Sequence, residues 1–542
     1  MTVRLAAVVL LALGLVGCAP PAAAPRNDSI REDDLRADLH FLASDALQGR
    51  LTNTPGNAAA AEFVRMRFAR LGLQPAGSEG SYFHRYDLMT ATLGAQNSLT
   101  VVEAGRRRNL TPGVDFHPHR FSGTGDAAGP VVFAGFGITS PERDHDDLKG
   151  DAVRGAILLV LDHEPGETDP QSPFDGVVRA EAASALRKAL GAQARGAAGL
   201  LVVSDVHNHE PGDFSVSARG YWPETPLRVE RYSLASWMKA MTIPVAQVSP
   251  EAAESLVRGT GRTLRDLAAS AETPGGVTPT PLPDIEVALT ADVDRHIVPD
   301  RNVVALAEGS DPALKDEVVV VCAHYDHEGV AGDRTFNGAD DDGSGTVGLL
   351  EIAEAYSLAA QDGRRPRRSV LLAAWNTEER GLLGAWAWAE EATPDRIVAV
   401  LNMDMIGRNE EVPEGQGDSG RFRGLEVQTA ASNDNAINII GTTRSADLQA
   451  AVERANQAIG LELKFRYDNN SSNLMRRSDH WPFLQRGVPA LWFHTGLHPD
   501  YHTERDRPEA INYPKMARIA RLVHQMSWDL ANADGRPAMN SR

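Results

Sequence analysis

Residues 317–327 read EVVVVCAHYDH, an apolar run that ends in two histidines and an aspartate. A continuous apolar run of this length, rich in β-branched residues, is typical of a strand buried on both faces of a parallel sheet. Similar runs lie at 369–375, 397–401 and 489–493, and helical patterns lie at 345–360, 382–391 and 516–530. Strands that alternate with helices predict an α/β fold, here a three-layer α/β/α domain around a mixed, mostly parallel sheet.

Length and composition narrow the class of protein. The chain has 542 residues, which suggests about three or four domains' worth of chain. Lys and Arg total 54 and Asp and Glu total 73, so the formal net charge is −19. We expect no nucleic-acid partner, because phosphate contacts need clustered basic residues and the chain as a whole is acidic. Two cysteines, Cys18 and Cys322, are too few for a disulfide framework.

The beginning of the chain has the pattern of an export signal. Arg4 precedes an apolar run at 5–17, which is shorter than the roughly 20 residues of a membrane-spanning helix. The run ends in Leu-Val-Gly before Cys18 and resembles a bacterial lipobox. The resemblance implies removal of residues 1–17 and lipidation of Cys18. With Ala19 next in the chain, it implies an exported protein anchored to the outer membrane, facing the periplasm, or to the cell surface. An ordinary signal peptide with an incidental cysteine is the alternative.

Titratable side chains follow the predicted strands, at the point where each strand ends. They are His324, Asp326 and His327, then Asp340 to Asp342, Glu378 and Glu379, Asp404, and finally His494 and His502. In an open α/β sheet the carboxyl ends of the strands meet in one crevice. Packing these groups together without a counter-charge would be costly, and a divalent metal removes that cost. Mixed imidazole and carboxylate ligands suit zinc.

Five motifs occur in order along this stretch: His-x-Asp, Gly-Ala-Asp-Asp-Asp-x-Ser-Gly, Glu-Glu-x-Gly-Leu-x-Gly, Asn-x-Asp-Met and Tyr-His-Thr. In this order they resemble the co-catalytic di-zinc aminopeptidases, metallopeptidase family twenty-eight of the glutamate carboxypeptidase and transferrin-receptor superfamily. One motif alone would be weak evidence, whereas five in order are specific. The resemblance implies a zinc metallopeptidase with peptide substrates and two Zn²⁺ ions per chain.

The resemblance also implies a ligand set for the two ions. His324 and Asp404 would bind one zinc ion, and Glu379 and His502 would bind the other. Asp341 would bridge both. Each ion would then have three protein ligands and an open position, which is the catalytic arrangement of zinc.

Three further residues receive roles from the same resemblance. Asp326, two residues past a ligand, would orient the imidazole of His324. Glu378, next to a ligand in the chain, would be the general base. Tyr501 would donate a hydrogen bond to the developing oxyanion.

A second domain is expected inside the chain. Short apolar runs at 156–161 and 199–203 bracket a small-residue helical stretch, and a Pro- and Gly-rich segment follows at 273–281. Residues 131–138 and 196–200 resemble the protease-associated (PA) domain. The predicted division is a signal peptide at 1–17, the lipidated cysteine and a tether at 18–30, a catalytic domain at 31–120 and 283–535, a β-rich PA-like insertion at 121–282, and a tail at 536–542.

Several other polar residues have simpler interpretations. Asp340 and Asp342 are interpreted as solvated loop acids, His327 as a loop or pocket-wall residue, His494 and His498 as supports of the His502 loop, and the pairs His117/His119 and His207/His209 as surface residues. Asp479 is expected either to line the substrate pocket or to cap a turn.

The motifs predict an aminopeptidase that releases N-terminal residues from peptides. A carboxypeptidase, dipeptidase or N-acyl amino-acid hydrolase on the same site is the alternative, and Arg476 and Arg477 keep it open because a carboxylate terminus needs a cation. A non-catalytic binding protein on the same fold is a remote third hypothesis, since such a protein would lack metal ligands. The sequence gives no indication of the oligomeric state.

Overall fold

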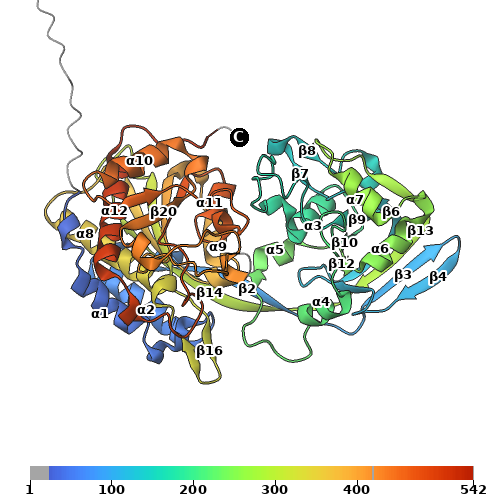
Figure 1. Ribbon diagram of the computed structural model, residues 1–542, viewed down its shortest axis with the longest axis horizontal. Coiled ribbons are helices and arrows are strands. Elements are labelled where there is room, and N and C mark those ends of the chain that lie inside the picture. The colour runs from blue at the N-terminus through green and yellow to red at the C-terminus, as the bar shows by residue number, and fades with distance from the viewer. Residues whose placement is uncertain (1–23, 418–419, 541–542) are drawn as a thin grey trace, which may run out of the picture.

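The structure is a computed structural model, and it describes residues 24–417 and 420–540. These residues form two bodies that lie side by side, each built around its own sheet (Figure 1). The predicted signal segment, with Cys18, lies outside the described residues.

The larger sheet has ten strands. Its order is β11 (Ser233–Leu234), β2 (Phe83–Leu93), β14 (Val293–Ala307), β18 (Ser369–Trp375), β15 (Val318–His324), β19 (Ile397–Met403), β22 (Ala490–His494), β20 (Ala436–Ile440) and β21 (Glu462–Lys464), with β1 (Gln74–Pro75) beside β14. The four central strands β18, β15, β19 and β22 are parallel. The neighbours β14 and β20 are antiparallel to them. The predicted α/β fold is confirmed, although only the central strands are mostly parallel.

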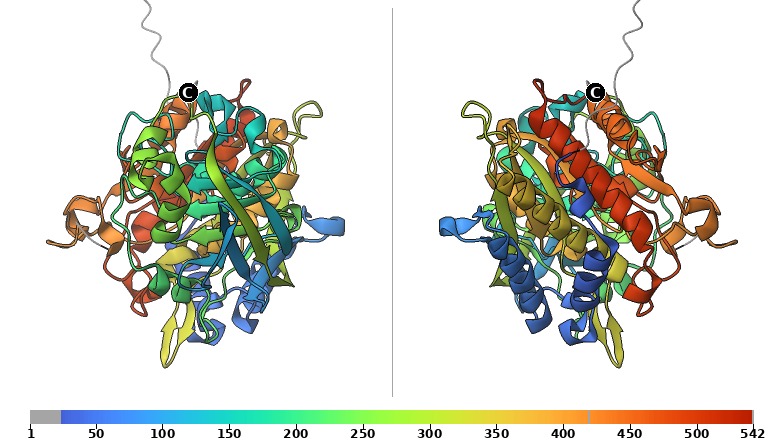
Figure 2. Two further views of the ribbon diagram at one scale, coloured as in Figure 1. Left: turned by 90° about the vertical axis from the view of Figure 1, so that its right-hand side faces the viewer. Right: turned by 90° about the vertical axis from the view of Figure 1, so that its left-hand side faces the viewer.

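Helices cover both faces of this sheet. One face carries α1 (Glu32–Leu42), α2 (Pro55–Arg70), α8 (Gly345–Gln361), α10 (Ala446–Asn456) and α12 (Tyr513–Asn532), and the other carries α9 (Leu383–Glu391) and α11 (Trp481–Gln485). The red α12 helix lies across the first face in Figure 2. Alternate residues of β15 enter the two apolar cores, as Val319 and Val321 do on one face and Val320 and Cys322 on the other. Helix α8 is buried almost all round rather than amphipathic, because α1 and α12 pack against it from outside.

The smaller sheet belongs to the insertion. Its order is β4 (Arg106–Leu110), β3 (Ser98–Glu103), β13 (Thr280–Ala291), β6 (Gly125–Phe133), β9 (Ile157–Leu161), β10 (Gly199–Val203), β12 (Val245–Val248) and β5 (Phe116–Pro118). Helix α3 (Ala185–Ala194) packs on one face, and α6 (Pro250–Val257) and α7 (Leu264–Ala271) pack on the other. Two-stranded ribbons complete the described strands: β7 (Thr139–Ser140) with β8 (His145–Asp146), and β16 (Gly329–Ala331) with β17 (Arg334–Phe336).

The insertion is longer than the predicted 121–282. Strands β3, β4 and β5 lie before residue 121, and β13 continues past residue 282, yet all four pair within the smaller sheet. The smaller sheet therefore spans residues 98–291. Two long strands join the bodies, since β2 leads into the insertion and β14 leads out of it, paired to each other over eleven residues.

The insertion also returns a segment to the larger sheet. Strand β11 pairs with β2, and the short helix α5 (Ala235–Ala240) packs on β2 with Met89 and Ala91 in a small apolar cluster. Helix α4 (Phe214–Tyr221) precedes this segment. Among the described helices, none is long and apolar enough to cross a membrane.

Candidate metal centre

The carboxyl ends of the central parallel strands hold two overlapping groups of metal-ligand side chains. His324, Asp341 and Asp404 form one group, and His327, Asp341, Glu379 and His502 form the other. Within each group the possible ligand atoms lie within 4.8 Å of one another. Asp341 belongs to both groups. The structure thus brings together all five predicted ligands and gives Asp341 the shared position.

The first group is buried at the ends of β15 and β19. The Nε2 atom of His324 lies 3.3 Å from Asp341 Oδ1 and 3.7 Å from Asp404 Oδ1. The other ring nitrogen, Nδ1, lies 3.3 Å from the backbone oxygen of Asp326. Ser478 donates a hydrogen bond to Asp404 Oδ2. The carboxylates of Asp341 and Asp404 and the imidazole of His324 therefore converge on one position where a metal ion could bind.

The second group adds a histidine that the sequence did not assign. His502 Nε2 lies 2.8 Å from Asp341 Oδ2 and 3.3 Å from Glu379 Oε2. His327 Nδ1 lies 2.7 Å from Glu379 Oε1, and the ring is fully buried. The prediction that His327 is a pocket-wall residue was wrong in this respect, since it contacts a predicted ligand directly. Its position one residue after the His-x-Asp motif was the available signal.

The loop with three consecutive aspartates is buried throughout. Asp340 and Asp342 are fully buried rather than solvated, so that prediction was wrong. Asp342 accepts hydrogen bonds from the backbone N–H groups of His324, Gly345 and Met405, and it ties the loop to the strand ends. The Asp341–Asp342 peptide bond is cis.

Asp506 supports the same loop from the far end of the chain. Its carboxylate accepts hydrogen bonds from the backbone N–H groups of Asp340 and Asp341, at 3.0 and 3.1 Å. His498 Nε2 lies 3.3 Å from Asp340 Oδ2. Sequence reasoning missed Asp506, because its contact partners lie about 165 residues earlier in the chain.

Asp326 acts chiefly on the turn that carries Glu378 and Glu379. Its Oδ1 atom accepts from Glu378 N at 3.0 Å, and Oδ2 lies 3.4 Å from Glu379 N. Its carboxylate is 3.7 Å from His324 Nδ1, longer than a hydrogen bond, so the imidazole is oriented by the Asp326 backbone oxygen instead. Asp326 therefore positions both the predicted base and a predicted ligand.

A cavity of about 270 Å³ opens over these groups. Asp341, Glu378, Glu379, Asp404 and His502 all line it. Tyr501, Arg476, Arg477, Trp492 and His494 form further parts of the wall. The Tyr501 hydroxyl accepts a hydrogen bond from Arg477 Nη2 at 3.0 Å, and burial raises the Tyr501 pKa to about 12. A neutral phenol therefore faces the cavity near the predicted ligands.

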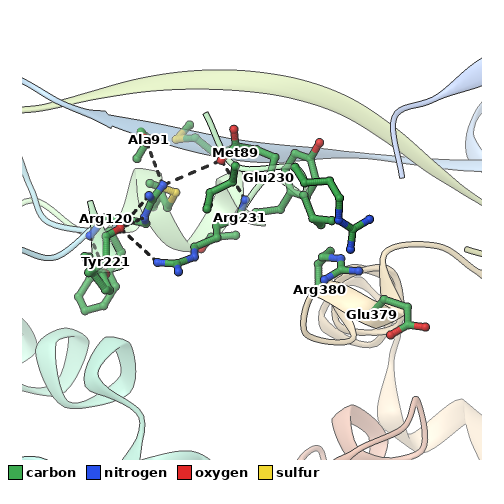
Figure 3. Close-up of a pocket in the computed structure, with 15 residues that line it drawn as sticks. Met89, Ala91, Arg120, Tyr221, Glu230, Arg231, Glu379 and Arg380 are labelled. Atoms are coloured by element: carbon green, nitrogen blue, oxygen red, sulfur yellow. Dashed lines mark hydrogen bonds and ion pairs between the residues drawn. The ribbon is translucent and has the colours of Figure 1, made fainter. Parts of the chain in front are cut away.

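A larger cavity of about 650 Å³ lies between the two bodies and reaches Glu379 and Arg380 (Figure 3). Its opposite wall comes from the insertion and includes Glu230 and Arg231. In Figure 3 the Glu379 and Arg380 side chains lie side by side, across the cavity from the insertion residues. The insertion thus shapes the space beside the metal-ligand groups.

The electrostatics of the centre call for a cation. Burial lowers the pKa of His324, but Glu378 and the neighbouring aspartates outweigh it and hold that pKa well above its usual value. His502 behaves in the same way beside Glu379. Burial, together with Asp404 and Glu379, raises the pKa of Glu378. The raised pKa values of His324 and His502 show that the surrounding carboxylates favour positive charge at these two imidazoles.

The donor atoms fit a metal. His324 Nε2, His502 Nε2 and Glu379 Oε1 are buried and have no hydrogen-bond partner outside the two ligand groups. Buried polar atoms without partners are rare, and they mark sites for an ion or water. Mixed imidazole and carboxylate donors are the ligands of catalytic zinc sites.

Other predicted residues belong to neither ligand group. His117 and His119 are buried in the insertion, so they are not surface residues. Asp479 is fully buried with no hydrogen bond to its carboxylate, and burial raises its pKa. Cys322 is a free buried thiol within β15, as expected.

Two imidazole–carboxylate groups that share one aspartate, at the carboxyl edge of an α/β/α sheet, are the arrangement expected of a zinc hydrolase site. Residues 302–527 match the model of Peptidase family M28, and the chain therefore carries a domain of that family. This stretch contains every predicted ligand.

Named relatives extend beyond the domain. The chain is 26% identical over 488 residues to the probable glutamate carboxypeptidase AMP1 of Arabidopsis thaliana, covering 84% of this chain and 61% of the relative. It is 29% identical over 261 residues to a probable zinc metalloprotease of Leptosphaeria maculans, covering 44% and 58%. The chain thus spans about three fifths of these relatives' length. Among solved structures, an aminopeptidase from Aneurinibacillus sp. strain AM-1 matches with a TM-score of 0.47 and 16% identity over 95% of this chain and 97% of that one.

Proposed function

We propose that the protein is a metallo-exopeptidase that hydrolyses peptide bonds with two zinc ions. One observation carries the proposal: Asp341 lies in both ligand groups, and Glu378 lines the cavity above them. The Peptidase family M28 domain and the names of the relatives support it. His324 and Asp404 would hold one ion, and Glu379 and His502 the other.

Glu378 and Tyr501 have separate roles in the proposed hydrolysis. Bound zinc lowers the pKa of water toward about 7 and polarises a carbonyl group. Glu378 accepts a proton from the attacking water and returns it to the leaving amine. Its carboxylate lies 3.8 Å from His324 Nε2, on a turn whose backbone N–H groups donate to Asp326. The Tyr501 hydroxyl donates to the oxyanion as the carbonyl carbon becomes tetrahedral.

The wall of the cavity favours an aminopeptidase. Arg476 lines the cavity, but its guanidinium is already engaged, because its Nη1 donates to the backbone oxygen of Arg179 in the insertion and its Nη2 lies 3.4 Å from Glu181. Arg477 supports the carboxypeptidase alternative, since it also lines the cavity and a guanidinium can pair with a carboxylate.

A matched substrate panel tests the proposal. Purified protein that lacks residues 1–18 is loaded with zinc. It is then tested on free-amine aminoacyl anilides and on N-blocked peptides with free carboxyl ends. We expect cleavage of the free-amine set alone, abolished by a chelator and restored by zinc. Cleavage of only the blocked set would move the assignment to a carboxypeptidase. No cleavage of either set by zinc-loaded protein would contradict the proposed function.

We also propose that the protein is exported and anchored by lipid at Cys18. The support is the apolar run at 5–17 and its Leu-Val-Gly ending. Expression with a labelled fatty acid tests this, and Cys18→Ala is the control. Label in the wild-type chain but not in the variant is expected, and an unlabelled wild-type chain would contradict the anchor.

A further inference from the structure

The insertion holds a second cluster of ligand side chains, separate from the proposed active site. It consists of His163, Glu167 and His209, whose ligand atoms all lie within 4.8 Å of one another. His163 Nδ1 lies 2.7 Å from Glu167 Oε2, and His209 Nε2 contacts Glu167 Oε1. The two imidazole rings lie 4.2 Å apart between centroids. One carboxylate therefore has an imidazole nitrogen at each of its oxygens.

The topology of the insertion explains why these side chains meet. His163 and Glu167 follow β9, and His209 follows β10, which is the parallel neighbour of β9. Loops after adjacent parallel strands leave the sheet at the same edge. His163 has a φ of 63° and Gly166 a φ of 67°, so the β9 loop turns back sharply and brings Glu167 over His163.

The two loops are held in place without the three ligands. The Glu272 carboxylate accepts from Gly166 N at 2.7 Å and from Asn208 Nδ2 at 2.7 Å, so it links one loop to the other. Asp205 accepts from His207 N at 2.9 Å and from Asn208 Nδ2 at 2.8 Å. Lys188 donates to the backbone oxygens of Leu161 and His163. The backbone that carries the cluster is thus preorganised.

The donor set is that of a metal site rather than of a simple ion pair. Glu167 Oε1 is buried, and its close polar neighbour is His209 Nε2 of the cluster itself. Two imidazoles that were both protonated would repel each other at this separation, whereas one divalent ion accepts a lone pair from each of the three groups. Two histidines and a glutamate form a known zinc ligand set, and imidazole also suits the neighbouring first-row metals.

We propose that His163, Glu167 and His209 bind a divalent transition metal ion of the zinc type, in addition to the proposed ions of the crevice. The side chains of His163 and His209 are 30% and 43% exposed, and that of Glu167 is 14% exposed. Solvent can therefore reach the site and supply the remaining ligands.

A metal ion at this site would stabilise the loop after β9, which contacts the catalytic body. The chain after Glu167 reaches Val177 and Arg179, whose backbone N–H groups donate to Asn469 Oδ1 and Asn473 Oδ1 at 2.9 and 2.8 Å. An ion at the base of this loop restricts the loop and stabilises the contact between the bodies. Its role is structural, because the cluster does not line the crevice.

Zinc content and anomalous scattering test the proposal on the whole mature chain. Wild-type protein loaded with zinc and then dialysed should carry one more ion per chain than Glu167→Gln or His209→Ala. His207→Ala is the matched control, since it removes the same residue type from the same loop and should keep the full content. Crystals of the loaded protein should show an anomalous zinc peak between His163, Glu167 and His209.

The outcomes separate this inference from the proposed function. Equal zinc content in the wild type and both variants, or no peak at the cluster, would overturn the inference even if the crevice is loaded. A peak at the cluster with an empty crevice would overturn the two-zinc proposal and leave the inference standing. Anilide turnover of the variants should match the wild type.

Discussion

The crevice of the larger sheet and the cluster of the insertion arise in the same way but differ in what surrounds them. In both, a histidine follows one parallel strand and its partner ligands follow neighbouring strands or loops. His324 in the crevice is fully buried, whereas His209 in the insertion cluster is 43% exposed. The topology therefore brings ligands together in both bodies. The greater burial of the crevice strengthens the electrostatic interactions between its ligands.

The supporting contacts differ as well. Around the crevice, Asp326, Asp342 and Asp506 each accept backbone N–H groups of residues that carry or flank ligands. In the insertion, Glu272 and Asp205 hold the loops, but no described residue donates to or accepts from His209's ring apart from Glu167. We therefore expect the crevice to bind metal more tightly and to carry out catalysis, and the insertion cluster to bind a structural ion less tightly.

The largest expected effect is on catalysis, and it should occur without loss of bound metal. Glu378→Gln removes a proton acceptor and keeps the side chain's size, so kcat on an aminoacyl anilide should fall about 10²- to 10⁴-fold. Zinc content should stay at the wild-type value, because Glu378 belongs to neither ligand group. Turnover and zinc content are measured on the same preparation. Normal kcat with full zinc would show that another group is the base.

A smaller effect tests the supporting contacts of the crevice. His327→Ala removes the nitrogen that lies 2.7 Å from Glu379 Oε1, and such supporting groups typically contribute about 10- to 100-fold to metal affinity. Zinc affinity, measured by competition with a chelator, should weaken by that factor, and His327→Gln should recover part of it. At saturating zinc, kcat should change by a smaller factor than the Kd for zinc. An unchanged affinity in His327→Ala would mean that His327 only fills space.

Local pattern predicted that the polar side chains gather in one crevice, and the motif resemblance implied which of them are ligands. Apolar runs mark the central strands, and the polar residues that follow each run meet because parallel strands end at one edge. The same reasoning missed the burial of Asp340 and Asp342. Their environment is made by Asp506 and His498, which reach the loop from more than 150 residues away, and no local pattern records such a contact.

The limits of the insertion were misplaced for a related reason. Strand β13 ends at Ala291 and β14 begins at Val293, so the chain passes from one sheet to the other across a single residue. No change of composition marks that point. The Pro- and Gly-rich stretch at 273–281, which suggested a boundary, instead leads into a strand of the smaller sheet. Sheet membership depends on pairing with distant strands, which the sequence pattern does not show.

Arg50 shows the same dependence on distant partners. It is fully buried, and its guanidinium donates to the backbone oxygens of Leu42, Tyr325, Asn337 and Gly338. These bonds fix the segment after β15 that leads to the aspartate loop. A lone arginine after a helical segment gives no sign of this role in the sequence.

The smallest expected effect concerns a buried carboxylate that has no metal to balance it. Glu351 on α8 is 1% exposed, and its closest cation is the Arg67 guanidinium, 3.6 Å away. Burial raises the Glu351 pKa to about 8, and Glu354 and Asp34 add to the shift. The folded chain therefore keeps a proton that the unfolded chain loses near its usual pKa of 4.5, so stability falls as pH rises from about 4.5 to about 8.

Glu351→Gln removes this titration and should flatten the pH dependence of Tm. We expect the Tm of the variant to rise relative to the wild type between pH 5 and pH 8, by a few degrees at pH 8. Thermal melts at one-unit intervals measure the difference, with Glu62→Gln on α2 as a control whose exposed side chain should give no such trend. A constant difference across the range would show that Arg67 neutralises Glu351 in the folded chain. In that case a single guanidinium balances a buried carboxylate, whereas the several carboxylates of the crevice still require divalent ions.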